Sequence, residues 1–492
     1  MNHSIWIVIA VFFPILCGAA VLILPVFRER ARLIRMTGIA LAVTAALAML
    51  VIFGGEKELL LLQFGDNLKI FFRVDALGRL YAVIVSLVWV LAGVFSFEYM
   101  KHEQEEKRYF GFYLIVYGVL LALAFSGNLI TFYVFYEIMT LTSLPLVLHT
   151  RTREALMAGM KYLFYSLCGA YMVLLGIYFM NQYAVTLDFT AGGSLDMTRV
   201  VGHEGMLLVI AFFMILGFGV KAGMFPMHAW LPTAHPVAPA PASAVLSGLI
   251  VKAGVIGVIR TVFYVIGPDF LRGTWVQTTW LVLTLITVFM GSMLAYREKL
   301  LKKRLAYSTV SQASYILFGL ALLQPKAMTG SLLHIVFHAI IKSCLFLSAG
   351  AIIYRTGRTR VDELTGIGKE MPVTIWCYTF ASLALIGIPP ASGFISKWYL
   401  ATGSLESGIS VFSWLGPVVL LVSALLTAGY LLPITIKGFL PGADYDYKSL
   451  KKLEPVKTMT IPLAILAALA VLLGVFPNPL TAYLSGIVSA VL

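Results

Sequence analysis

The stretch FGVKAGMFPMHAWLP, residues 218–232, interrupts a long apolar run with a lysine, two glycines and two prolines. A proline inside a helix removes a backbone hydrogen bond and clashes with the preceding turn. In lipid the freed carbonyls must face protein or water, so a broken helix that carries Lys221 indicates a polar cavity. A second stretch, LIGIPPASGFISKW at residues 385–398, places two prolines before Lys397. Broken helices in two halves of one chain are typical of an ion site in a transporter.

The composition places most of the chain in lipid. Of its 492 residues, 60% are hydrophobic and 12% are charged, and the mean hydropathy is +0.92. A soluble chain has roughly a quarter of its residues charged, so this composition excludes a soluble enzyme, a disordered protein and a disulfide scaffold. The four cysteines lie in apolar runs without a CxxC pair, which argues against iron–sulfur or zinc ligation. Without a Walker A or GxGxxG motif, we expect neither a cofactor nor a metal in this chain.

Apolar runs that are long enough to cross a bilayer recur along the whole sequence. A membrane helix needs about 20 apolar residues, and fourteen runs are consistent with that length. We therefore predict an all-α polytopic membrane protein with about 14 transmembrane helices. The runs lie near residues 5–26, 33–53, 78–99, 109–126, 129–149, 155–180, 206–232, 241–266, 275–296, 305–323, 330–354, 372–402, 411–436 and 459–490.

The net charge of +13, from 36 Lys+Arg against 23 Asp+Glu, gives the orientation. On a soluble domain such a charge would suggest nucleic acid, but basic residues also gather in the cytoplasmic loops of membrane proteins. With the N-terminus outside, 23 of the 36 basic residues fall in inside loops and six fall in outside loops. We therefore expect both termini outside and no nucleic-acid partner.

The two interrupted runs are the seventh and the twelfth, five spans apart. An odd offset inverts the second unit relative to the first. We predict two inverted five-helix repeats at residues 109–266 and 275–437, each with one broken helix. A three-helix segment at 1–100 precedes them, and a last helix at 459–492 follows.

Seven basic residues fall within the predicted spans. Arg79 and Arg260 lie near outer ends, where they can snorkel to water. Lys161 lies two turns from the cytoplasmic edge, so snorkelling and function both stay open. A lysine at mid-span costs about 2.5–3.5 kcal/mol on insertion scales, so it needs a wet cavity, an acidic partner or neutralisation. Lys221, Lys252 and Lys342 lie near mid-span, and Lys397 lies in the last third of its span.

One acidic residue, Glu137, lies clearly at the middle of a predicted span. A buried carboxylate and a buried ammonium suit each other, because either one alone tends to lose its charge. We expect Glu137 to meet Lys221 across two helices. A static structural ion pair is the alternative to a functional one.

The eleventh span, SLLHIVFHAIIKSCLFLSAG at residues 331–350, places His334, His338 and Lys342 on one helix face over about 12 Å. Two histidines at this spacing can bind zinc, but a catalytic site needs a third ligand, and no HExxH is present. A satisfied structural pair is a second alternative. We favour a proton relay, because histidine titrates near neutral pH and the lysine continues the row.

His228 and His235 lie beside the first interruption, in a proline-rich segment. This segment is either a rigid loop that packs on the bundle or a wet cytoplasmic inlet. The deep charges form a row from Glu137 and Lys221 to Lys397, which is predicted to lie nearer the outside. The row indicates a lateral relay at mid-membrane with one opening at each surface.

Several stretches resemble one family, the antiporter-like membrane subunits of complex I, of Mrp cation/proton antiporters and of membrane-bound hydrogenases. The resemblance covers about residues 70–440 and is most specific from Lys221 to Arg260. Lys397 stands where one complex I subtype carries Glu, which points to the other complex I subtypes or to an Mrp D-type or hydrogenase-type member. Further matching stretches are YEIMTLTSLPLV around Glu137, KKRLAYSTVSQ at 302–312, HIVFHAIIKS at 334–343 and GIPPASGFISK at 387–397.

This resemblance implies proton translocation, with Na⁺/H⁺ exchange left open, in the cytoplasmic membrane of a prokaryotic cell. It implies other integral membrane subunits as partners and, in a redox complex, peripheral iron–sulfur subunits that carry the redox chemistry. It assigns the ion pair to Glu137 and Lys221 and the outer end of the relay to Lys397. It assigns the central relay to Lys252, His334, His338 and Lys342. Two alternatives are a stand-alone cation/proton antiporter and an oxidoreductase subunit that contributes to a quinone site.

Overall fold

The computed structural model describes residues 5–492 apart from 56, 66, 443–444 and 446–449. The elements of the N-terminal part are α1 (Ile5–Ile23), α2 (Arg30–Phe53), β1 (Glu58–Gln63), β2 (Lys69–Arg73), α3 (Ala76–Tyr99), α4 (Glu106–Ala124), α5 (Leu129–Val147), α6 (Arg153–Tyr183), α7 (Met197–Val200), α8 (Glu204–Ala222), α9 (Leu231–Val237), α10 (Ala240–Val245) and α11 (Val251–Ile259). Those that follow are α12 (Pro268–Leu271), α13 (Trp275–Arg297), α14 (Leu301–Ala321), α15 (Pro325–Thr356), α16 (Ile367–Glu370), α17 (Pro372–Ile386), α18 (Ser392–Glu406), α19 (Phe412–Phe439), α20 (Lys457–Val475) and α21 (Asn478–Val491). Shorter helical turns lie at Pro25–Arg28, Leu246–Ile250, Arg260–Ile266 and Val361–Leu364.

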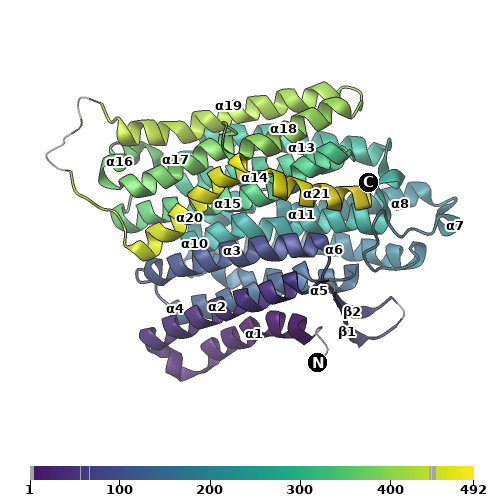
Figure 1. Ribbon diagram of the computed structural model, residues 1–492, viewed down its shortest axis with the longest axis horizontal. Coiled ribbons are helices and arrows are strands. Elements are labelled where there is room, and N and C mark those ends of the chain that lie inside the picture. The colour runs from purple at the N-terminus through teal and green to yellow at the C-terminus, as the bar shows by residue number, and fades with distance from the viewer. Residues whose placement is uncertain (1–4, 56, 66, 443–444, 446–449) are drawn as a thin grey trace.

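The long helices run roughly parallel to the longest axis of the molecule and lie side by side across it, from α1 at the bottom of the view to α19 at the top (Figure 1). The chain begins α1 and ends α21 toward the same end of the molecule, which also carries the β1–β2 hairpin (Figure 1). Two termini at one end are compatible with an even number of crossings.

Twelve helices in the described part of the chain are long and apolar enough to cross a membrane. The tenth predicted run is α14, whose first turn carries three basic residues, and the twelfth is divided between α17 and α18. The last predicted run is also two helices, because α20 ends at Val475 and α21 begins at Asn478. The number of fourteen crossings and the repeat boundaries therefore stay predictions.

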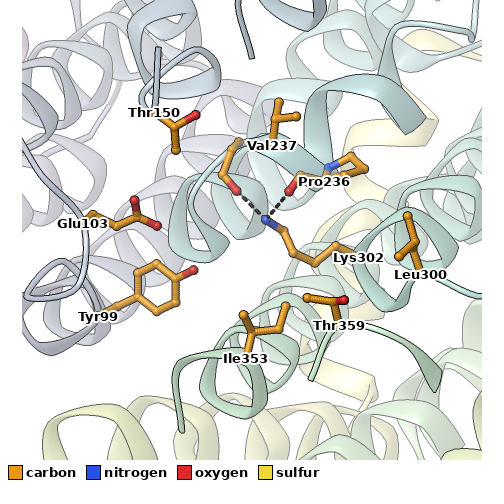
Figure 2. A pocket seen from close by; sticks show the side chains of 10 residues that line it. Tyr99, Glu103, Thr150, Pro236, Val237, Leu300, Lys302, Ile353 and Thr359 are labelled. Carbon is orange, nitrogen blue, oxygen red and sulfur yellow. Dashed lines mark hydrogen bonds between the residues drawn. The ribbon is translucent and has the colours of Figure 1, made fainter. Parts of the chain in front are cut away.

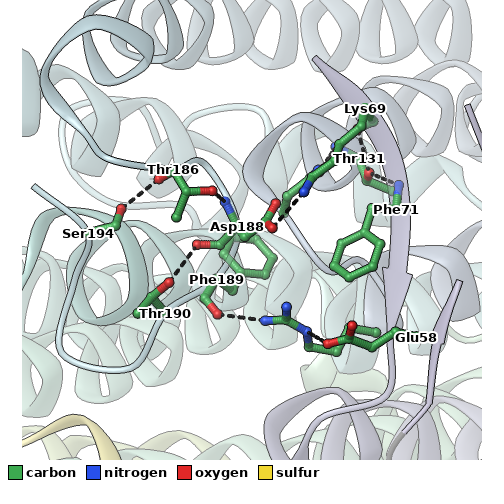
Figure 3. A network of polar contacts seen from close by, with 11 residues as sticks. Glu58, Lys69, Phe71, Thr131, Thr186, Asp188, Phe189, Thr190 and Ser194 are labelled. Atoms are coloured by element: carbon green, nitrogen blue, oxygen red, sulfur yellow. Dashed lines mark hydrogen bonds and ion pairs between the residues drawn. The ribbon is translucent and has the colours of Figure 1, made fainter. Parts of the chain in front are cut away.

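The hairpin of β1 and β2 is an element that the all-α prediction missed, because such short strands give no clear periodicity. Figure 3 shows how polar contacts fix it to its surroundings. Lys69 pairs with Asp188 at 2.7 Å, and the backbone N–H of Phe71 donates to the Thr131 hydroxyl at 2.9 Å. These contacts anchor the beginning of α5, the helix that carries Glu137.

The core of the bundle is formed by α15, buried from Ala327 to Ile352, and by the segment Ala240–Ile266, which is buried throughout. That segment is not a regular α-helix. A π-helical turn at Leu246–Ile250 precedes Lys252, and a second covers Arg260–Ile266. Single π turns occur frequently at functional sites.

Both proline-containing stretches interrupt a helix. α8 ends at Ala222, and Gly223 follows with φ 76°, before the chain turns toward α9. α17 ends at Ile386, and Gly387 follows with φ 92°, before α18. Glycine ends a helix readily in this left-handed conformation, because it lacks a Cβ atom.

The prediction that Arg260 snorkels to water is wrong. Its side chain is 1% exposed and donates two hydrogen bonds to Asp75, one of them 2.8 Å long from Nη2 to Oδ1. Asp75 is the N-cap of α3 and also accepts from the backbone of Gly78. A bidentate carboxylate satisfies a buried guanidinium without water, so this pair joins α3 to the core.

Candidate functional site

Lys221 lies in the last turn of α8 and is completely buried. Its Nζ donates to the hydroxyls of Thr140, Tyr162 and Ser166 at 2.9, 3.1 and 2.8 Å. The Nζ atom also lies 4.4 Å from the centre of the Tyr162 ring, a cation–π distance. An ammonium has three N–H donors, so this cluster of hydroxyls uses all of them.

The predicted contact between Glu137 and Lys221 is not formed in this structure. Among the described residues, Lys221 forms no ion pair, because three hydroxyls occupy its donors. Glu137 is half-buried on α5, one helical turn before Thr140. Its Oε1 atom is buried without a hydrogen-bond partner in the described part of the chain. The two charges still interact electrostatically.

Lys252 follows the first π-helical turn, which positions its side chain. Its Nζ donates to the Ser247 carbonyl at 2.8 Å and contacts Nδ1 of His338 directly. The other ring nitrogen of His338, Nε2, is buried and has no hydrogen-bond partner among the described residues. The structure therefore brings together Lys252 and His338, which are 86 residues apart.

His334 continues this contact along α15. Its ring centre lies 5.8 Å from that of His338. Nδ1 of His334 bonds the Ser396 hydroxyl at 2.8 Å, and Nε2 bonds Oε1 of Gln312 at 3.1 Å. The ring also stacks on Tyr315, with centres 5.7 Å apart. His334 thus joins α15 to α14 and α18.

Lys342 is completely buried, and its Nζ donates to the Leu305 carbonyl of α14 at 3.0 Å. It interacts electrostatically with Lys252 and with His338. It forms a branch beside the His334–His338 row.

Lys397 lies just after the second interruption. Its Nζ donates to the carbonyls of Leu385 and Ile386 at 2.6 and 2.9 Å, which are the last acceptors of α17. The same atom lies 5.0 Å from the centre of the Tyr315 ring. Tyr315 therefore contacts both His334 and Lys397. Lys397 also lines a cavity of about 200 Å³ between α18 and α19.

The three accessory candidates near the first interruption, His235, His228 and Lys161, occupy separate positions. His235 is completely buried on α9, and both of its ring nitrogens lack hydrogen-bond partners among the described residues. His228 is half-buried in the turn before α9 and interacts electrostatically with Lys161. Lys161 is half-buried on α6. Neither of these two reaches the row of contacts from Lys252 to Lys397.

The sequence analysis missed the hydroxyls and the amide that connect the charged groups. Serine and threonine are frequent in membrane helices, so single ones within apolar runs carry little signal. The missed residues are Thr140, Tyr162, Ser166, Gln312, Tyr315 and Ser396.

Comparison with known proteins connects this site to a family. The family described as NADH:quinone oxidoreductase/Mrp antiporter, transmembrane, matches residues 126–436. The chain belongs to this family. The N-terminal family of NADH-ubiquinone oxidoreductase (complex I) chain 5 also matches, at residues 62–110. Every deep titratable group described above lies within the first match.

Two relatives and one solved structure extend the family assignment. NADH-quinone oxidoreductase subunit N of Desulforudis audaxviator is 30% identical, over 82% of this chain and 81% of its own length. Hydrogenase-4 component B of Escherichia coli is 32% identical, over 82% of this chain and 62% of its own length. The fold is similar to that of a chain in the Mrp complex of a Dietzia species, with a TM-score of 0.85 and 22% identity, over 99% and 97% of the two chains.

Proposed function

We propose that this chain is an ion-translocating membrane subunit of a multi-subunit assembly of the complex I, Mrp or membrane-hydrogenase type. It lies in the cytoplasmic membrane with both termini outside, and other integral membrane subunits are its partners. The observation that carries the proposal is a continuous buried row of titratable groups across α11, α15 and α18. Intramembrane ionisable residues are costly and typically mark an ion pathway.

The row supports proton transfer along the plane of the membrane. Lys252 contacts His338, His338 lies beside His334, and His334 bonds the hydroxyl of Ser396, which directly precedes Lys397. Neutral imidazole and amine groups accept and release protons over such distances, directly or through one hydroxyl or water.

Glu137 and Lys221 form the other end of the proposed relay. Gly254 lets α11 approach α8, the helix of Lys221. A Cβ atom at residue 254 would lie 2.9 Å from Cβ of Lys221. No direct bond joins Lys221 to Lys252 among the described residues, so water completes this step. Glu137, with its free Oε1, biases the charge on Lys221.

The test is proton translocation by the intact assembly. The tagged chain is purified in mild detergent with its co-purifying subunits, which are identified and reconstituted in vesicles containing a pH-sensitive dye. Translocation is driven by a sodium gradient or by the electron donor of co-purifying redox subunits. Glu137→Ala and Lys221→Ala abolish translocation while the assembly survives.

Two surface variants serve as matched controls. Lys326→Ala and Glu58→Ala remove a lysine and a carboxylate from exposed ion pairs outside the row. Near-normal translocation by both buried variants would refute the assigned roles. Recovery of the chain as an active lone transporter would favour the stand-alone antiporter instead, and a quinone-binding site in the purified chain would favour the oxidoreductase subunit.

A further inference from the structure

A cavity of about 360 Å³ lies between the loop after α3, the α9–α10 junction and the first turn of α14. Two charged side chains line it, Glu103 and Lys302, and Figure 2 shows them on facing sides. A second cavity of about 450 Å³ adjoins it and shares Glu103 and Thr150. Both cavities are large enough for several water molecules, and the loops around them are those predicted to face the cytoplasm.

Lys302 closes the inner side of this cavity. Its side chain is 9% exposed. Its Nζ donates to the carbonyls of Pro236 and Ala238, the first at 3.0 Å, as Figure 2 shows. Among the described residues Lys302 forms no ion pair, but its charge interacts with that of Glu103 across the cavity. A lysine held by two neutral carbonyls can lose its proton without leaving a carboxylate unpaired.

His235 directly precedes Pro236, which Lys302 bonds. Its ring is stacked on Phe346 with centres 4.7 Å apart, and neither ring nitrogen has a partner within the described residues. Buried polar groups are normally hydrogen-bonded, so two orphaned nitrogens need a functional or solvent explanation. The lysines that interact electrostatically with this ring are Lys302, Lys342 and Lys252. His235 therefore stands between the cavity and the central row.

We propose that Glu103 and Lys302 form a proton-uptake site that feeds His235 and, through it, Lys342 and Lys252. The inference rests on the proposed function. A proton passes from the Lys302 ammonium through a water molecule to a His235 ring nitrogen, and the imidazolium passes a proton through water to the Lys342 amine. Lys302 regains a proton from the Glu103 carboxyl, which takes the next one from water in the cavity. Each step breaks one N–H or O–H bond and forms another.

Two titratable loop groups line the cavities, Glu103 and His149, and only one of them is suited to carry protons near neutral pH. Burial raises the pKa of Glu103 above its usual range, so its carboxyl holds a proton closer to neutral pH. Burial, together with the charge of Arg108, lowers the pKa of His149 to about 4. His149 lines the second cavity and stays neutral under physiological conditions, so Glu103 is the better proton carrier.

The experiment measures proton translocation by the intact assembly with Glu103→Gln and Lys302→Gln, which keep side-chain size and remove the titrating group. Each variant slows translocation about tenfold or more, less than the full 100-fold or more of a general acid–base group, because water in the cavity still supplies protons. Formate added on the cytoplasmic side restores the rate of Glu103→Gln, since the cavity admits a small acid that replaces the carboxyl. Lys303→Gln, in which the next residue loses a surface ion pair with Glu298, keeps the normal rate.

Lys302→Arg tests whether Lys302 acts as a proton carrier or only as a structural hydrogen-bond donor. Arginine keeps the charge and can bond both carbonyls, but it does not release a proton in proteins, so this variant assembles and stays slow. Normal translocation by Lys302→Arg, or by Glu103→Gln and Lys302→Gln together, would overturn the uptake site. A slow Glu103→Gln that formate does not restore would also overturn it. A Lys252→Ala variant distinguishes failure of the uptake site from failure of the proposed function. Full activity of Lys252→Ala would overturn the proposed function itself.

Discussion

Both helix interruptions leave backbone carbonyls that need hydrogen-bond donors, and the donors differ between the two. After α8, the Val220 carbonyl is capped by the indole N–H of Trp230 at 2.8 Å, and Lys221 is sealed among hydroxyls. After α17, the last carbonyls are capped by Lys397 itself, which borders a cavity. Freed backbone groups at membrane depth must be satisfied by protein or water. In the first break an uncharged donor performs this task, and in the second a titratable group combines it with ion transfer.

The largest effect on proton translocation is expected for the lysine that lies beside each helix interruption. Lys221→Ala and Lys397→Ala each reduce proton translocation by about 100-fold or more, because each removes a proton carrier from a series of obligatory transfers. Arginine at either position does not restore the rate, since a guanidinium keeps its proton. Vesicle acidification by the reconstituted assembly measures the rate. Pumping at the normal rate by Lys397→Arg would contradict the role of Lys397 as a proton carrier.

A second prediction uses the different access of small molecules to the positions of Lys397 and Lys221. A small amine such as ethylamine restores several-fold of the lost rate in Lys397→Ala, because the cavity of about 200 Å³ admits it to the missing side chain's position. The same amine does not rescue Lys221→Ala, since Lys221 is 0% exposed. The same dye assay, titrated with amine, gives the comparison. Equal rescue of both variants would mean that the sealed break opens during turnover.

The sequence predicted the buried charges and the interruptions for physical reasons. A lysine such as Lys221 or Lys252 in an apolar run is costly, and prolines beside it leave carbonyls unbonded, so each pattern carries its own signal. The contacts could not be predicted in the same way. Asp75 and Arg260 are 185 residues apart, and no local pattern announces that a distant carboxylate will meet a guanidinium.

The replacement of Glu137 by hydroxyls as the direct partners of Lys221 was equally hidden. Charge complementarity favours the carboxylate, but the geometry places Thr140, one turn later on α5, closer to the ammonium. The π-helical turn before Lys252 also has no compositional signature, since LSGLI reads as ordinary apolar helix.

A third prediction tests the uncharged cap. Trp230→Phe removes the indole donor of the Val220 carbonyl and lowers the free energy of unfolding by about 0.5–1.5 kcal/mol, the net value of one hydrogen bond, because the Gly223 backbone N–H still bonds this carbonyl at 3.0 Å. Trp280→Phe is the matched control, because Trp280 is equally buried and its Nε1 has no partner among the described residues. Thermal unfolding of the purified assembly measures both. Equal losses would mean that lost volume, not the hydrogen bond, sets the cost.

The last prediction concerns the two glycines that end the broken helices. An alanine in the left-handed conformation costs about 1–2 kcal/mol, and Gly357→Ala, at φ 70° with open space around it, measures this cost alone. Gly223→Ala exceeds it, because its Cβ would lie 2.4 Å from Cδ1 of Leu231. Gly387→Ala places a Cβ 3.0 Å from Cδ of Lys397, and this flexible side chain moves away from its carbonyls. Gly387→Ala is therefore expected to match Gly357→Ala in stability but to slow proton translocation, whereas a normal rate would show that Lys397 works without its backbone contacts.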